Sequence, residues 1–254
     1  MYASIVLTVA QSKRLIAKAV AALPEVRRAL EEGTVAIGRG TTNAYVAEEV
    51  LGHEIPKGEY VAGRTMPKRV PGNLLGTGAY PDIVLKKGEA VDNATVVGAV
   101  AEMGPDDVFI KGGNALNYPE RVVGILVGHP TGGTIGGTYG TIISRKIHLI
   151  IPIGLEKLIH EDINALSRVT RDAAAHPAAP VVSLFPITGT VITEIEAFHL
   201  LCDVEARLLS AGGVAGAEGA VWLLLEGGAR ELDAALTLYE RLADEPNLAV
   251  HQQT

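Results

Sequence analysis

Three glycine-rich turns are the part of this chain whose residue types and spacing are best suited to chemistry. They occupy residues 38–43, 111–114 and 131–141, and each follows a short apolar run typical of a strand. Glycine lets the backbone adopt positive φ and lets its N–H groups approach a ligand closely. A glycine turn that leads into a helix also gathers free N–H donors and the positive end of the helix dipole, which suits a phosphate or a carboxylate. We therefore expect one anion-binding crevice at the ends of parallel strands.

The residues predicted to contact the anion come from all three turns. The threonine pair of the first turn is also expected to cap the following helix. The glycines and threonines of the third turn can form a nest of backbone N–H groups that holds an anion. The predicted ligand-binding residues are Gly38, Gly40, Thr41, Thr42, Asn43, Gly112, Gly113, Asn114, Gly136, Gly137 and Thr138. The histidines show no metal-ligand spacing, so we expect neither a metal nor a bound cofactor.

The composition narrows the class of protein. The 254 residues carry 22 Lys and Arg against 29 Asp and Glu, a formal net charge of −7, which speaks against nucleic-acid binding. A single cysteine excludes an internal disulfide and a cysteine-based zinc site. The sequence has no leader-like opening and no apolar run near the roughly 18 residues of a membrane span. We expect a cytoplasmic protein without a membrane partner, and the aliphatic composition favours a homo-oligomer.

The elements that must position the turns alternate between helical and strand-like patterns. Helices are predicted over residues 12–32 (with an interruption at Pro24), 42–51, 94–103, 140–145 and 156–168, and strands over 34–37, 107–110, 122–127 and 148–153. Strands separated by helical patterns are typical of a parallel sheet covered on both sides. The pattern predicts an α/β fold with a Rossmann-like, three-layer domain over residues 1–170.

Two segments depart from this alternation. Residues 53–93 are rich in glycine, proline and basic residues and are predicted to be an insertion or lid with a hairpin at 82–91. After a linker at 171–180, the pattern becomes β-α-β-β-α-β, which is the ferredoxin-like order. The predicted strands of this part are 181–187, 205–211, 220–226 and 248–250, and its helices are 193–201 and 230–242. We therefore expect a small ferredoxin-like α+β domain over residues 180–254.

The first two turns resemble those of ribose-5-phosphate isomerase A. Gly33-Thr34-Val35-Ala36-Ile37-Gly38-Arg39-Gly40-Thr41-Thr42, set between two helices, is similar to the strand and phosphate loop that open that family. Ile110-Lys111-Gly112-Gly113-Asn114 is similar to its lysine-glycine loop. The wider group is the superfamily of glucosamine-6-phosphate isomerase, ribose-5-phosphate isomerase and CoA transferases. This resemblance covers residues 12–160 and implies a sugar phosphate or a CoA ester as substrate.

The resemblance also implies catalytic roles. An aldose–ketose isomerase needs a carboxylate base, a donor for the enediolate oxygen and a phosphate anchor. Glu120 would be the base, Lys111 the electrostatic partner, and residues 40–43 the anchor. The family's acidic motif has no counterpart at residues 104–109. Residues 186–195 are loosely similar to the amino-acid-binding turn of an ACT domain.

Three functions therefore stay open. The first is an isomerase or CoA-transferase-like enzyme that acts on a small anionic substrate. The second is a ligand-binding or regulatory protein without catalysis. The third is an oligomeric structural protein whose glycine turns serve packing alone.

Overall fold

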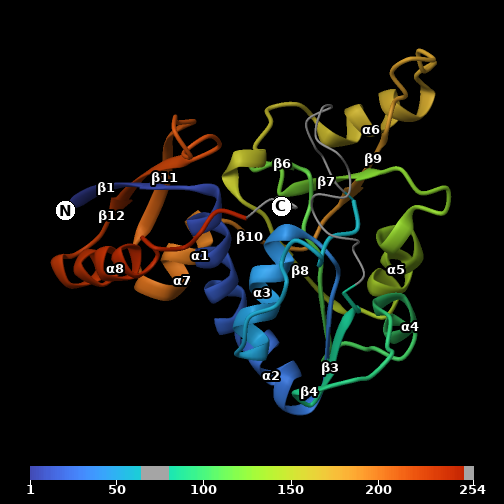
Figure 1. Cartoon of the computed structure of the whole chain (residues 1–254), viewed down its shortest axis with the longest axis horizontal. Coiled ribbons are helices and arrows are strands. Elements are labelled where there is room, and N and C mark those ends of the chain that lie inside the picture. Colours follow the sequence, from blue (N-terminus) through green and yellow to red (C-terminus); the bar gives the residue numbers. More distant parts are fainter. Residues whose placement is uncertain (64–79, 249–254) are drawn as a thin grey trace, which may run out of the picture.

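The computed structural model describes residues 1–63 and 80–248, and these residues form a mixed α/β fold (Figure 1). The predicted α/β class is confirmed. The central sheet of the described residues has the strand order β10-β8-β5-β2-β3-β4, and the first four strands in that order run parallel. The strands are β2 (Thr34–Ile37), β3 (Ile83–Lys86), β4 (Glu89–Ala90), β5 (Val108–Ile110), β8 (His148–Pro152) and β10 (Thr190–Ile192).

Helices cover both faces of the central sheet (Figure 1). On one face lie α1 (Val9–Ala22), α2 (Pro24–Glu32) and α3 (Thr41–Leu51), and on the other lie α4 (Val96–Val100) and α5 (Gly133–Ser144). A capping box of Thr8 and Gln11 begins α1. Pro24 begins α2, where its missing N–H costs nothing. No helix within the described residues is long and apolar enough to cross a membrane.

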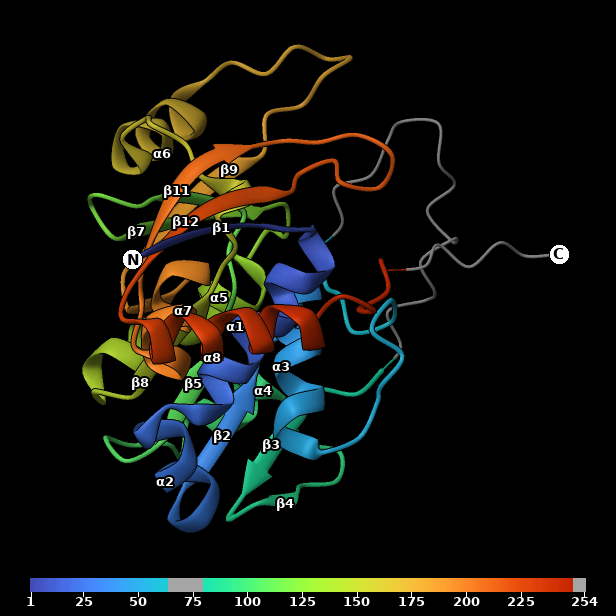
Figure 2. The ribbon, with the colours of Figure 1, turned by 90° about the vertical axis from the view of Figure 1, so that its left-hand side faces the viewer.

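Two smaller antiparallel sheets complete the fold. The first has the order β6-β7-β9 and packs against α6; the second has the order β1-β12-β11 and lies over α7 and α8 (Figure 2). Their elements are β1 (Tyr2–Leu7), β6 (Ala115–Asn117), β7 (Val122–Val127), β9 (Ser183–Ile187), β11 (Glu205–Ala211), β12 (Val221–Glu226), α6 (Ile163–Asp172), α7 (Glu194–Cys202) and α8 (Ala229–Arg241).

Among the described residues, the strands predicted over residues 180–254 do not join in one ferredoxin-like sheet. The predicted strands that the structure describes are divided between two sheets: β9 pairs with β7, while β11 and β12 take β1 from the amino terminus as their third strand. Between them, the unpredicted strand β10 pairs with β8 of the central sheet. Apolar alternation identifies a strand, but long-range packing selects its partner. Most of the strand predicted at 248–250 lies outside the described residues.

The predicted insertion at 53–93 contributes to the central sheet. Its hairpin forms as β3 and β4, and β3 pairs antiparallel with β2. Residues 64–79 of that segment lie outside the described residues.

The third glycine turn is also shorter than predicted, because α5 begins at Gly133 instead of Gly140. Ile135, Thr138 and Ile142 are buried at helical spacing on one side of α5, so packing overrides the low helix propensity of glycine.

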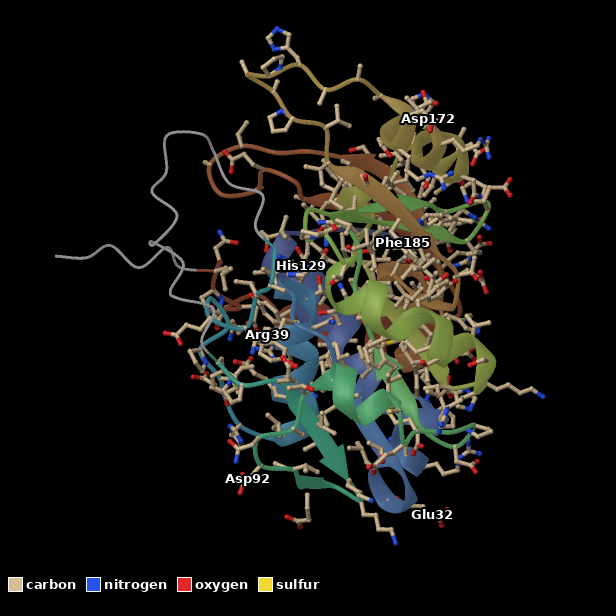
Figure 3. All side chains as sticks on the ribbon, turned by 90° about the vertical axis from the view of Figure 1, so that its right-hand side faces the viewer. Glu32, Arg39, Asp92, His129, Asp172 and Phe185 are labelled. Carbon is tan, nitrogen blue, oxygen red and sulfur yellow. The ribbon has the colours of Figure 1, made fainter. Side chains whose placement is uncertain are left out.

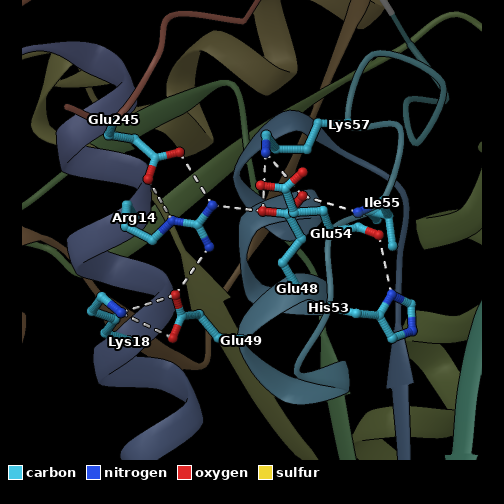
Figure 4. A network of polar contacts seen from close by, with 9 residues as sticks. All are labelled: Arg14, Lys18, Glu48, Glu49, His53, Glu54, Ile55, Lys57 and Glu245. Carbon is cyan, nitrogen blue, oxygen red and sulfur yellow. Dashed lines mark hydrogen bonds and ion pairs between the residues drawn. The ribbon is translucent and has the colours of Figure 1, made fainter.

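A network of ion pairs fixes α3 against α1 (Figure 4). Arg14 of α1 contacts Glu48 at 2.6 Å, Glu49 at 3.0 Å and Glu245 at 2.8 Å, and Lys57 contacts Glu48 at 2.9 Å. Burial opposes ionisation of Glu48, but hydrogen bonds from Lys57 and Arg14 outweigh it and hold the pKa of this carboxyl below its ordinary value. The network therefore holds the helix that follows the first glycine turn.

Candidate functional site

A cleft of about 1190 Å³ lies at the carboxyl edge of the parallel strands. All three glycine turns contribute to it: residues 39–43 follow β2, residues 111–114 follow β5, and residues 128–129 and 132–135 join β7 to α5. Ligands of open α/β sheets bind at this edge because loops from neighbouring strands converge there. The predicted residues that line the cleft are Gly40, Thr41, Thr42, Asn43, Lys111, Gly112, Gly113 and Asn114.

The first turn leads directly into α3. Gly40 is the residue before the helix, and no side chain caps it. The predicted capping role of Thr41 or Thr42 is therefore wrong, because both residues already belong to the helix. Within the described part of the chain, α3 therefore has no side-chain capping bond at its first turn, and the positive end of its helix dipole lies at the cleft.

Asn43 joins the first two turns. Its buried amide nitrogen donates to the carbonyl oxygen of Gly38 at 2.6 Å and to that of Ile110 at 3.4 Å. Its Oδ1 atom is buried without a hydrogen-bond partner among the described residues. Asn43 therefore holds the ends of β2 and β5 together and retains an unused acceptor at the cleft.

Lys111 leads the second turn and is half-buried. Its Nζ donates to the carbonyl oxygen of Gly112 at 3.1 Å. Burial and the charge of Lys157 lower the pKa of Lys111 to about 8. Gly113 follows where packing leaves no room for a side chain, since a Cβ would lie 2.1 Å from Val123.

Two further lysines at the cleft were missed by the sequence analysis. Lys13 comes from α1, and Lys157 follows β8 and donates to the carbonyl oxygen of Gly113 at 3.0 Å. Burial and Lys157 lower the pKa of Lys13 to about 8, although Glu156 acts in the opposite direction. The place of Lys157 just after a predicted strand was a usable signal. Lys13 gave none, because it looks like part of an ordinary polar helix face.

The charged side chains of the described cleft lining are all basic. Lys13, Lys111 and Lys157 are joined by Arg39, which forms a 2.7 Å ion pair with Asp82. His129 also lines the cleft, and Arg39 and His129 are labelled in Figure 3. Acidic side chains are missing from this lining as far as the structure describes it. The charged side chains of the described lining are therefore suited to an anion although the chain is acidic overall.

The third turn brings only its amino-terminal part to the cleft. Gly132 and Gly133 have φ of 80° and 58° and begin α5, again without a side-chain cap. The predicted Gly136, Gly137 and Thr138 lie farther along the helix and do not line the cleft. Gly136 is packed so tightly that a Cβ would lie 2.3 Å from the carbonyl oxygen of Thr131. The backbone nest predicted over this segment is replaced by a helix.

Two other predicted residues also lie outside the cleft lining. Glu120 is exposed in the turn between β6 and β7, where its backbone N–H donates to Oδ1 of Asn117 at 3.2 Å. Gly38 lies beneath the side chain of Lys111, since a Cβ there would be 2.9 Å from the Cδ of that lysine. The structure therefore separates Glu120 from the cleft and gives Gly38 a packing role.

A pair of carboxyl groups that the sequence analysis missed lies near the lysines. Glu194, at the start of α7, is fully buried, and its Oε2 accepts a hydrogen bond from the N–H of Leu155 at 2.9 Å. Burial and the charge of Glu156 raise the pKa of Glu194 to about 7. One oxygen of each carboxyl group is buried without a partner among the described residues. Glu156 in turn lies 4.0 Å from Nζ of Lys157.

Comparisons with known proteins found no match among protein-family models, curated proteins or solved structures. The fold and the site together define an α/β protein with a basic, glycine-lined cleft at the carboxyl edge of its parallel strands.

Proposed function

We propose that this protein binds a small phosphorylated or carboxylated ligand in the cleft. The main support for this proposal is the charge of the cleft lining. Its described residues include four basic side chains and no acidic one; the basic residues are Lys13, Arg39, Lys111 and Lys157. Desolvation and the repulsion between neighbouring lysines destabilise the charged form of their side chains. The lowered pKa values of Lys13 and Lys111 reflect this effect. An anion relieves that destabilisation by pairing with them.

The helix termini support the same ligand chemistry. Both α3 and α5 begin at the cleft without a side-chain cap, so their first N–H groups can donate to an anion. Such ends bind phosphate and carboxylate groups through free donors and the helix dipole together. Structural packing alone explains Gly113 and Gly136 but gives no reason for the convergence of lysines.

The reaction stays a prediction. Similarity of the first two turns to the superfamily of sugar-phosphate isomerases and CoA transferases favours an enzyme of Rossmann-like fold that acts on a sugar phosphate or a CoA ester. The place of Glu120 outside the cleft lining favours a different base, or ligand binding without isomerisation. The expected homo-oligomer and the cytoplasmic location likewise stay predictions.

A thermal-shift screen tests the proposal. The panel contains inorganic phosphate, sulfate, sugar phosphates, CoA esters and amino acids. Each compound is tested against the wild-type protein and the variants Lys157→Met and Lys86→Met. A ligand at 100 times its Kd stabilises the folded protein by about 2.7 kcal/mol, which a melting curve detects. We expect phosphate compounds to stabilise wild type and the exposed-lysine control Lys86→Met, and Lys157→Met to respond much less. Equal responses from all three proteins would place the anion elsewhere.

A further inference from the structure

Lys111 differs from the other lysines of the cleft in its electrostatic surroundings. Lys157 has the carboxylate of Glu156 within 4.0 Å, and the same carboxylate acts on Lys13. Within the described part of the chain, Lys111 forms no ion pair, and the charged group that acts on it is Lys157. As far as the structure describes its surroundings, its amine is therefore held beside a positive charge without a compensating carboxylate.

The backbone around Lys111 fixes the position of its amine. The aliphatic stem lies across Gly38, with Cδ 2.9 Å from where a Cβ of that residue would be. The amine donates to the carbonyl oxygen of Gly112, which is an uncharged acceptor. Asn43 holds these two turns together beneath the cleft. The amine thus has a defined place and leaves the cleft open beside it.

These surroundings favour the neutral amine. With a pKa of about 8, roughly a tenth of Lys111 is neutral at pH 7, against less than about a thousandth for an ordinary lysine. A neutral lysine amine attacks carbonyl carbon, and desolvation beside another cation is a recognised means of activating it.

We propose that Lys111 forms an imine with a ligand that carries an aldehyde or a ketone beside its anionic group. This inference rests on the proposed function, because the basic residues and the helix ends must hold the anionic group while the carbonyl carbon meets the amine. The ligand class is thus a small phosphorylated or carboxylated carbonyl compound.

The step is balanced without an oxidant or reductant. The nitrogen lone pair of neutral Lys111 forms a C–N bond to the carbonyl carbon as the C=O π bond breaks, and the nitrogen gives up one proton while the oxygen takes up one, which yields a neutral carbinolamine. The hydroxyl group then takes up a second proton and leaves as water while the nitrogen lone pair forms the C=N bond, and the remaining N–H proton of the protonated imine is released to solvent to give the neutral imine. The protons exchange with solvent at the open cleft, and hydrolysis reverses the sequence.

Reductive trapping with pyridoxal 5′-phosphate tests the inference, since this probe has both an aldehyde and a phosphate. Full-length protein is mixed with the probe at pH 7.5, sodium borohydride reduces any imine to a stable amine, and peptide mass spectrometry locates the adduct. Pyridoxal, which lacks the phosphate, is the matched control probe. The exposed Lys86 and Lys87 are internal controls for random labelling.

We expect pyridoxal 5′-phosphate to modify Lys111 at least about tenfold faster than Lys86 or Lys87. Modification of Lys111 should be slower when pyridoxal replaces this probe and when inorganic phosphate is added. Lys111→Met should lose the adduct, and Lys86→Met should keep it. Because the site is mapped on wild type, the result does not depend on whether a variant folds. Uniform labelling, or preferred labelling of Lys13 or Lys157, would overturn the inference.

A parallel thermal-shift titration separates the two proposals. If phosphate and the probe stabilise the protein through Lys157 but no adduct appears at Lys111, the anion site stands and the imine is rejected. If neither compound stabilises the protein and labelling is uniform, both proposals fail.

Discussion

The side chain of Lys111 lies over Gly38, so that a Cβ atom at Gly38 would be 2.9 Å from Cδ of the lysine and 3.3 Å from the carbonyl oxygen of Ile110. The backbone N–H of Gly38 donates to that same carbonyl oxygen at 2.8 Å, which fixes the separation between the two turns. Close approach is therefore the reason for glycine at this position.

Gly38→Ala should move the amine of Lys111. The added methyl group must displace the lysine stem or lengthen the hydrogen bond to Ile110, and overpacking of this kind costs about 1–3 kcal/mol. We expect slower trapping of Lys111 by pyridoxal 5′-phosphate and a lower free energy of unfolding in urea. Gly104→Ala is the matched control, because nothing lies within 4 Å of its added Cβ. If Lys111 is trapped in Gly38→Ala at the wild-type rate, the position of the lysine side chain over residue 38 does not affect imine formation.

Anion affinity should fall as the pH rises through 8. Lys111 and Lys13 both have a pKa lowered to about 8, so each loses its positive charge over the range in which an ordinary lysine keeps it. Sulfate is a suitable probe because it stays a dianion throughout. Isothermal titration at constant ionic strength should give a Kd several-fold higher at pH 9 than at pH 7.

The variant Lys111→Met assigns this dependence. This variant should bind sulfate more weakly than wild type at pH 7, and its sulfate Kd should change less between pH 7 and pH 9. The sulfate Kd of Lys86→Met should change with pH as it does in wild type. A sulfate Kd that does not change between pH 7 and pH 9 would contradict the ionisation of cleft lysines in this range.

Arg14→Met should destabilise the protein by about 3 kcal/mol, because it leaves the buried carboxylate of Glu48 with fewer partners. The pKa of Glu48 is lowered in the folded protein, so this contribution is present above the ordinary carboxyl pKa and is lost as the pH falls through the folded value. Urea unfolding at pH 7 measures the effect.

Arg28→Met is the control for this prediction. Arg28 forms a 3.6 Å ion pair with Asp106, and both side chains are exposed, so its loss should cost less than about 1 kcal/mol. Equal losses from the two variants would mean that the network in Figure 4 behaves like an ordinary surface pair.

Local patterns were enough to predict the strands that carry the cleft. Thr34–Ile37 is a short apolar run between two glycines, and its predicted bounds match β2. The three residues of β10 gave no comparable signal, because so short a run is common in loops. The amino-terminal strand β1 and the division of the carboxyl-terminal strands among three sheets depend on long-range pairing, which alternation in one segment does not specify.

The residues of the candidate site that directly follow a strand could be predicted from the sequence. Those that reach the site from other elements could not. Lys111 and the glycines around it were recognised because glycine turns at strand ends have a local signature. Lys13 reaches the cleft from α1, and only the packing of that helix brings it there. Glu194 was hidden for the same reason, since its burial depends on segments far apart in the sequence.

Glu194→Gln should remove a pH dependence from stability. The folded pKa of Glu194 is about 7 against an ordinary 4.5, so between these values the unfolded chain releases a proton that the folded protein keeps. Stability should therefore fall as the pH rises from 4.5 to 7 and level off above 7. The shift corresponds to a loss on the order of 3 kcal/mol in wild type.

Urea unfolding at pH 5 and pH 8 measures this difference. Glutamine keeps an acceptor for the N–H of Leu155. We expect wild type to lose more stability than Glu194→Gln between the two pH values, and the exposed-residue control Glu120→Gln to lose as much as wild type. Parallel losses in all three proteins would show that Glu194 ionises in the folded protein as it does in the unfolded chain.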